Sequence, residues 1–209
     1  MSKLLSRPYL SAFRVIMKPF DSFELIKEKN YGAVWQPAVI VLLLFLTRVF
    51  NLVFGGFIFN MTEISQVNLP VEFATVVSIY LLFIFANKNF CDLFEGEGTM
   101  TEVALATAYA LLPYIICSCV NIVLSNVFVM REESFMGIIS AIGLLWSALV
   151  GFVGLKSVHR YSFGKTVLTV LVTFLFMALI AFLLAILFLI TQQLVIFVKD
   201  IYTEIVFRM

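Results

Sequence analysis

The sequence predicts an all-α polytopic membrane protein, a transmembrane bundle of five helices with amphipathic interfacial helices at both ends. Two observations carry this prediction. Of the 209 residues, 62% are hydrophobic and 13% are charged, whereas a soluble domain has about 45–50% apolar and about 25% charged residues. Stretches such as 38–46 and 167–190 hold no charged side chain at all. The chain therefore lacks the polar surface that a water-soluble fold of its size requires.

The same composition excludes several classes of protein. A soluble enzyme is excluded, and so is a nucleic-acid-binding protein, because the net charge is only +1 and a polyanion needs a basic surface. The three cysteines, Cys91, Cys117 and Cys119, do not have the even number and polar setting of a disulfide framework. The single histidine, His159, is interpreted as a loop residue at the membrane interface. We expect no catalytic residue, no metal site and no cofactor.

Residues 1–32 are predicted to form a cytoplasmic amphipathic segment. Apolar residues recur every three or four positions over 10–29, with basic residues between them, which is the pattern of a helix with one apolar face. Pro19 interrupts such a helix because proline has no N–H to donate, and Asp21 or Ser22 is expected to cap the second piece. The segment is expected to lie in the headgroup layer of the membrane, with docking onto a partner subunit as the alternative.

Residues 33–192 are predicted to form the five-span membrane domain. A bilayer core of about 30 Å needs about 20 apolar residues in a helix that rises 1.5 Å per residue. Pro113 lies inside the third span and leaves the carbonyl near Tyr109 without its helical donor, so a local bend is expected there. Thr99 or Thr101 is expected to cap the start of that helix. The spans are predicted at 34–54, 71–90, 103–129, 135–155 and 166–191.

Residues 193–209 form an amphipathic tail that either continues the fifth helix or turns onto the outer surface. The chain is predicted to lie in the plasma membrane with its amino terminus inside and its carboxy terminus outside, because loops rich in Lys and Arg stay cytoplasmic. Ten Lys and Arg residues lie in the amino-terminal segment and in the loops 87–102 and 156–165, against three on the other side.

Small residues on the third and fourth spans predict close helix packing. Ala108 and the alanines near it allow another helix to approach, and Gly143, Ser147 and Gly151 form a ridge at four-residue spacing. Tight packing within the five-helix bundle is the simpler interpretation, and a face shared with another membrane protein is the alternative.

One charged residue, Arg48, lies about two-thirds of the way across the first span. An arginine at the centre of a membrane helix costs about 2.5–3.5 kcal/mol, so it needs a compensating environment. It either reaches the headgroups or pairs with Glu63, Glu72 or Asn51, or it contacts an anionic substrate or the carboxylate of a partner. The predicted spans hold carboxylates only at their edges, which argues against an ion-coupled carrier.

Residues 91–115 contain an acidic, glycine-rich loop followed by a helix of small residues. This region resembles the Yip family (Ypt-interacting proteins), which has an Asp-Leu-Tyr-Gly-Pro-like element followed by a Gly-Tyr-x-x-x-Pro element. Phe94 replaces the tyrosine, no proline follows Gly96, and Ala108 replaces the glycine of the second element. These departures favour the bacterial branch. The resemblance rests on Asp92, Leu93, Phe94, Gly96, Gly98, Tyr109 and Pro113.

The resemblance implies a non-enzymatic membrane protein that acts by association. For a bacterial homologue it implies an accessory or scaffold subunit bound to the permease of an ABC-type transporter, for example a carbohydrate importer. Another integral membrane protein and membrane lipid are therefore the expected partners. A small transporter or channel in its own right is the first alternative, and a membrane-trafficking or lipid-handling protein is the second.

Overall fold

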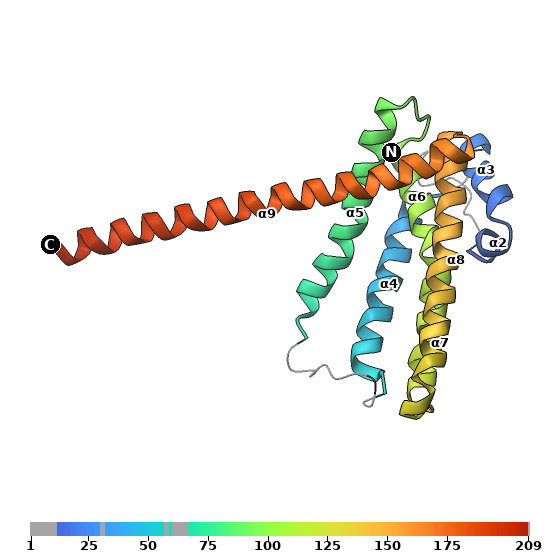
Figure 1. Ribbon diagram of the computed structural model, residues 1–209, viewed down its shortest axis with the longest axis horizontal. Helices are drawn as coiled ribbons and strands as arrows, with labels where there is room; N and C mark the ends of the chain where they lie inside the picture. Colours follow the sequence, from blue (N-terminus) through green and yellow to red (C-terminus); the bar gives the residue numbers. More distant parts are fainter. Residues whose placement is uncertain (1–11, 30–31, 57–58, 60–66, 209) are drawn as a thin grey trace.

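The computed structural model describes residues 12–29, 32–56, 59 and 67–208. These residues form helices and contain no strand. Five segments are long and apolar enough to cross a membrane, which confirms the five-span prediction and makes the chain a multi-pass membrane protein (Figure 1). The segments are α4 (Trp35–Phe54), α5 (Leu69–Leu93), α6 (Met100–Ala110) with α7 (Leu112–Ser125), η2 (Met130–Glu132) with α8 (Glu133–His159), and α9 (Phe163–Arg208).

Two short helices, α2 (Ala12–Met17) and α3 (Pro19–Lys29), precede the first span. The break before Pro19 is confirmed, but the predicted cap is wrong. Helix α3 begins at Pro19 itself, which places Asp21 in its first turn rather than before it. The physical reason is that the first turn of a helix does not use its N–H groups, so proline costs nothing there.

The apolar faces of α2 and α3 are divided between the bundle and the outside. Val15, Phe23 and Ile26 are at most 1% exposed and belong to the core, and α3 packs on α8. Phe13 and Phe20 remain more than half exposed. The segment was predicted to lie in the headgroup layer, whereas one side of it covers the chain's own bundle.

The third span lies at the centre of the bundle. Half of its most apolar window is buried, a larger share than in any other span, and α6 contacts α4, α5 and α8. Its small residues permit this, because Ala106 and Ala108 are fully buried against neighbouring helices. An alanine surface allows helix axes to approach closely, which maximises van der Waals contact where lipid provides no hydrophobic driving force.

The expected bend at Pro113 is a break of one residue, Leu111, in the helix. Helix α6 ends at Ala110 and α7 begins at Leu112, because the proline ring cannot donate a hydrogen bond to the preceding turn. The amide of the next residue, Tyr114, donates to the hydroxyl of Ser147 on α8 at 3.0 Å. A side chain from the fourth span thus provides the acceptor for a backbone amide that has none within the third span.

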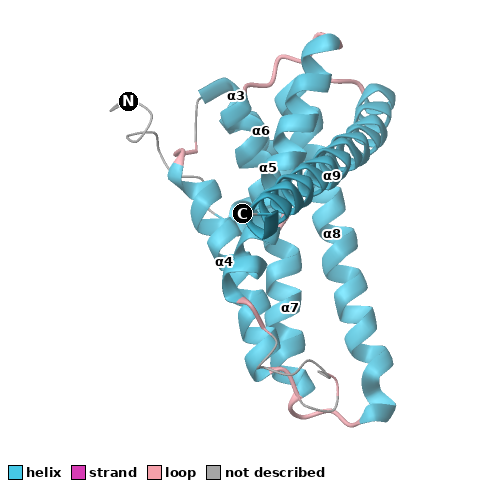
Figure 2. Cartoon of the chain, turned by 90° about the vertical axis from the view of Figure 1, so that its left-hand side faces the viewer, coloured by secondary structure: helices cyan, strands magenta, loops and turns pink. Residues whose placement is uncertain are grey.

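Helix α9 is continuous over 46 residues, so the tail continues the fifth helix instead of turning onto a surface. Its first turns pack mainly on α5 and less on α8. From Ala181 to Phe207 every residue is exposed. Figures 1 and 2 show this part of α9 running away from the other helices. Its apolar surface is therefore left without cover by the rest of the chain.

The predicted orientation can be tested with a reporter fused after Met209. We expect an external location. Ten basic residues favour a cytoplasmic amino terminus, and an odd number of spans places the carboxy terminus on the other side of the membrane. Alkaline phosphatase should be active and a cytoplasm-dependent fluorophore should be dark. A fusion after Ser2 should give the reverse result, and a cytoplasmic signal from both ends would contradict five spans.

Candidate functional site

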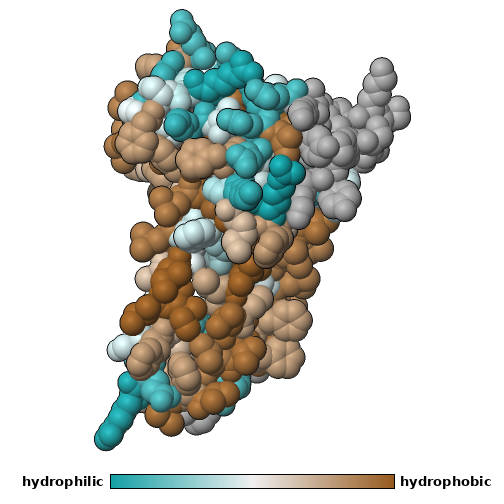
Figure 3. All heavy atoms as spheres, turned by 90° about the vertical axis from the view of Figure 1, so that its right-hand side faces the viewer, coloured by the Kyte–Doolittle hydropathy of each residue, from teal (hydrophilic) through white to brown (hydrophobic). Residues whose placement is uncertain are grey.

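The residues of the sequence motif meet at one end of the bundle, where the loop 94–99 joins α5 to α6. We call this end, which also carries α2 and α3, the loop end. Hydrophilic side chains gather there, whereas the shafts of the helices below are hydrophobic (Figure 3). The start of α6, helix α3, the turn between α8 and α9 and a buried polar cluster hold the loop in place.

The start of α6 closes the loop from below. The Thr99 amide donates to the carboxylate of Glu102 at 2.8 Å, and the Glu102 amide donates to the Thr99 hydroxyl at 3.3 Å. This reciprocal capping box satisfies two of the amides that a helix start leaves open. It confirms the expected cap at Thr99 and excludes the alternative at Thr101.

Helix α3 holds the loop through Lys27. Its ammonium donates to the carbonyl of Glu97 at 2.6 Å and to the carboxylate of Glu102 at 3.3 Å. The two charged side chains are only 12% and 9% exposed. Removing one partner of such an ion pair leaves an uncompensated buried charge, so the pair ties the amino-terminal helices to the motif.

The turn between α8 and α9 holds the loop through Tyr161. Its hydroxyl lies 3.2 Å from the carbonyl oxygen of Cys91 and 3.1 Å from that of Phe94. Burial raises the pKa of Tyr161 above its usual value. The hydroxyl therefore stays protonated and donates hydrogen bonds to these carbonyls. Tyr161 therefore supplies a donor to the Phe94 carbonyl and adds to the Phe94 and Gly96 amides that already donate to the Cys91 carbonyl.

A buried polar cluster lies directly beneath the loop. His159 Nε2 is 3.0 Å from Asn87 Oδ1, and Asn87 Nδ2 donates to the Thr173 hydroxyl at 3.1 Å. The three side chains come from α8, α5 and α9 and are at most 1% exposed. Since the Asn87 amide nitrogen donates to Thr173, its oxygen accepts from His159, which assigns the proton of the ring to Nε2.

The prediction that His159 is a loop residue at the membrane interface is wrong. Helix α8 extends four residues beyond the predicted end at Leu155 and finishes at His159. The ring is stacked on Tyr161, with centroids 5.3 Å apart. Its burial depends on residues about 70 positions away in the sequence, so no local sequence pattern predicts it.

Gly96 and Gly98 make the close approach of the loop possible. A β-carbon on Gly96 would lie 2.6 Å from the Tyr161 hydroxyl and 2.7 Å from His159 Nδ1. One on Gly98 would lie 2.7 Å from the same ring and from Val158. Side chains at these two positions would push the loop off the polar cluster, so both glycines of the motif have a steric role.

The rest of the first motif element faces outward. Leu93 is 79% exposed and Phe94 is 43% exposed, with the Phe94 ring stacked on Phe90 at 4.6 Å. Asp92 is also exposed and pairs with Lys88 one turn earlier. The loop end therefore presents an apolar tip beside a charged pair, on a backbone that is fixed from beneath.

The second motif element lies inside the bundle. Tyr109 is 2% exposed and makes a side-chain hydrogen bond with Gln36 on α4. Pro113 produces the break between α6 and α7, and Ala108 is fully buried. These residues pack the third span and do not line the loop.

The ridge of the fourth span faces the third span. A β-carbon on Gly143 would lie 2.6 Å from Cys117, and one on Gly151 would lie 3.2 Å from Ala110. Between them Ser147 accepts the hydrogen bond from Tyr114. The structure thus places this ridge against α6 and α7 of the same chain.

Arg48 pairs with Glu72, one of the partners that the sequence left open. Its Nε and Nη2 atoms both donate to one carboxylate oxygen, at 3.2 and 3.1 Å. The two side chains are 50% and 28% exposed. The pair links the last turns of α4 to the first turn of α5, so it lies at the end of the bundle opposite the loop end.

The comparison with known protein families shows which family the chain belongs to. A family model described as the Yip1 domain matches residues 13–190. This chain belongs to the Yip1 domain family. The match begins in α2 and ends in α9, so this Yip1 domain includes the amino-terminal helices as well as the five spans. Neither a curated protein nor a solved structure matches the chain.

The chemistry of the loop end of this Yip1 domain is that of a structural joint. The polar groups of Lys27, Glu102 and Tyr161 bind one another or nearby backbone, and Asn87 binds the side chains of Thr173 and His159. Among the described residues there is no group of three His, Cys, Asp or Glu side chains that could hold a metal ion. The arrangement fixes an outward-facing tip, which suits recognition of a partner.

Proposed function

We propose that this Yip1-domain protein is a non-enzymatic accessory or scaffold protein that binds another integral membrane protein. The observation that carries the proposal is the exposed part of α9. Over 181–207 this helix makes no buried contact with the rest of the chain, although it is apolar over most of its circumference. A helix of that kind needs a lipid or protein environment on every side.

The composition of the exposed part favours a protein. Ala181 and Ala185 have the four-residue spacing that lets membrane helices pack closely. Gln192 and Gln193 are exposed, and neither side chain makes a hydrogen bond to another described residue. Amide side chains on membrane helices act as interhelical hydrogen-bonding groups, each worth about 1–2 kcal/mol in model peptides. A helix from a partner offers them what lipid tails lack.

The partner that we propose is the permease of an ABC-type transporter in the plasma membrane, for example a carbohydrate importer. The resemblance to the bacterial branch of the family supports this choice. The fixed tip at Leu93 and Phe94 supplies a second contact surface, on the side where the cytoplasmic parts of such a transporter lie if the amino terminus is inside.

The experiment is affinity purification from native membranes in mild detergent, followed by mass spectrometry. We expect a permease and an ATPase in stoichiometric amounts. The double variant Gln192→Leu/Gln193→Leu should lower their recovery about tenfold, the equivalent of about 1.4 kcal/mol. Thr75→Val, which changes an exposed polar residue on α5, is the matched control and should retain them.

The outcomes separate the partner from the function. Recovery of a different membrane protein, lost in the α9 variant, would keep the accessory function and refute the ABC-type partner. Recovery of the chain alone, as a monomer or homo-oligomer, would refute the accessory function. Lipid handling is then the second candidate, favoured by a polar cavity at the other end of the bundle.

A further inference from the structure

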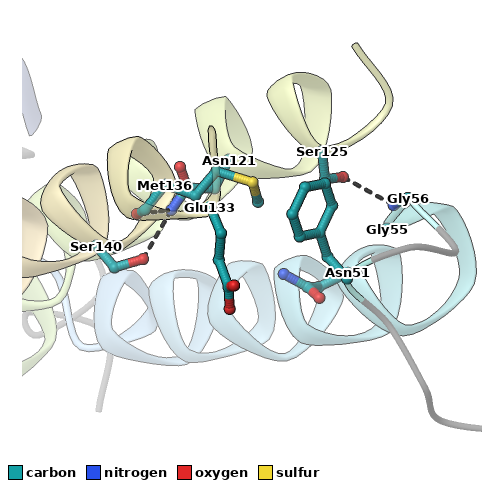
Figure 4. Close-up of a pocket in the computed structure, with 10 residues that line it drawn as sticks. Asn51, Gly55, Gly56, Asn121, Ser125, Glu133, Met136 and Ser140 are labelled. Carbon is teal, nitrogen blue, oxygen red and sulfur yellow. Dashed lines mark hydrogen bonds between the residues drawn. The ribbon is translucent and has the colours of Figure 1, made fainter. Parts of the chain in front are cut away.

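A polar cavity lies at the end of the bundle opposite the loop end, which we call the far end. Its volume is about 300 Å³, and it is formed where α4 ends, α7 ends and α8 begins (Figure 4). Helices α4 and α8 both pack on α7, with no comparable contact between each other. The cavity therefore has α7 as its floor and lies between α4 and α8.

The walls of the cavity are held in place by hydrogen bonds. Asn121 Nδ2 donates to the Met136 carbonyl at 3.1 Å and to the Ser140 hydroxyl at 2.7 Å. The Gly56 amide donates to the Ser125 hydroxyl at 2.8 Å. These bonds join α7 to α8 on one side and to the end of α4 on the other, so the space between them is preformed.

Among the described residues that line the cavity, Glu133 is the only charged one. Figure 4 shows the Glu133 carboxylate of α8 and the Asn51 amide of α4 extending into the same space. Among the described residues, Glu133 forms no ion pair. A carboxylate accepts hydrogen bonds from a ligand that carries positive charge and N–H donors.

The position of the cavity suggests the source of that ligand. It lies where α4 and α7 end and α8 begins, at the ends of segments long and apolar enough to cross a membrane, so we place it at the level of the lipid headgroups. A second cavity of about 210 Å³ continues along α4, shares Asn51 with the first and is lined by Arg48. Arg48 uses two of its five N–H groups on Glu72, so the others remain available to an anionic group beside the cation.

We propose that the far-end cavity binds the headgroup of an aminophospholipid, with its primary ammonium against Glu133 and its phosphate toward Arg48. A quaternary ammonium has the same charge but no N–H to donate. The cavity therefore distinguishes phosphatidylethanolamine from phosphatidylcholine. This site lies apart from the exposed part of α9, and the proposal does not depend on the proposed association with a partner.

The test is native mass spectrometry of the full chain with phosphatidylethanolamine and phosphatidylcholine of identical acyl chains in equal amounts. We expect about tenfold more bound phosphatidylethanolamine, from charge-assisted hydrogen bonds that the other lipid cannot form. Glu133→Gln should bring the ratio close to one. Glu95→Gln, an equal change of charge at an exposed residue of the loop end, should leave it unchanged.

A second variant fills the cavity instead of changing its charge. A β-carbon on Gly137, which lines the cavity, would meet nothing within 4 Å, so Gly137→Leu should fold and abolish retention of both lipids. Gly164 also has open space around it and lies in the first turn of α9, so Gly164→Leu is the matched control.

Three results would overturn the proposal, in addition to the displacement described below. One is equal binding of the two lipids by the unaltered protein. The second is a preference that survives Glu133→Gln, and the third is retention of either lipid by Gly137→Leu. A competitor without acyl chains tests whether the headgroup has to come from a lipid. Glycerophosphoethanolamine should displace no lipid at millimolar concentration. Full displacement by it would refute a lipid site.

Discussion

Replacing Gly98 by alanine is expected to destabilise the protein by about 1–3 kcal/mol, the usual cost of forcing an extra methyl group into a packed site. The added β-carbon would lie 2.7 Å from His159 and from Val158, and both side chains are at most 1% exposed. Neither can move aside without disturbing the polar cluster. This cost is larger than the stabilisation of about 0.4–1 kcal/mol that alanine gives by restricting the unfolded chain.

The measurement is the thermal midpoint of the detergent-solubilised protein, followed by intrinsic fluorescence. Gly164→Ala is the control with the opposite expected sign. Its β-carbon meets open space, and alanine within a helix is more favourable than glycine by about 0.5–1 kcal/mol. Equal midpoints for the two variants would show that the loop does not approach His159 as closely as the structure indicates.

Replacing Asn87 by alanine is expected to loosen α9 from the bundle. Asn87 is the only described side chain that hydrogen-bonds both to His159 on α8 and to Thr173 on α9. Without it His159 keeps a buried N–H that has no acceptor, which costs about 1–3 kcal/mol. Thr173 retains its bond to the Thr169 carbonyl, so the loss falls on the contact between helices.

Hydrogen exchange of the protein in nanodiscs measures this effect. Amides in the first turns of α9 should exchange faster in Asn87→Ala, because the opening free energy of that helix falls while the rest of the bundle stays packed. Asn89→Ala, two residues away and exposed, is the matched control and should match the unaltered protein. Unchanged exchange in Asn87→Ala would show that apolar packing alone holds α9.

The spans and several of their details could be predicted because each depends on a short stretch of sequence. An apolar run of about 20 residues is a strong signal by itself, and the break at Pro113 and the cap at Thr99 follow from the chemistry of one or two residues. The start of α3 was missed because a proline that breaks one helix is equally suited to begin the next.

The candidate site was predicted only in part. The motif located the loop 94–99, but the groups that hold it, among them Lys27 and His159, come from segments about 60 to 70 positions away, which a single sequence does not bring together. Asn87 was the one available signal. A polar amide within an apolar stretch needs a hydrogen-bonding partner, and that requirement marks it as part of a buried contact.

The hydrogen bond between Tyr114 and Ser147 has a consequence for biogenesis. The two residues are 33 positions apart, so when Tyr114 leaves the ribosome its acceptor is still inside it. A backbone amide without a partner in hydrocarbon is unfavourable by several kcal/mol. The third span is therefore not a finished transmembrane segment until the fourth arrives, and insertion machinery has to retain the two together and release them into lipid as a pair.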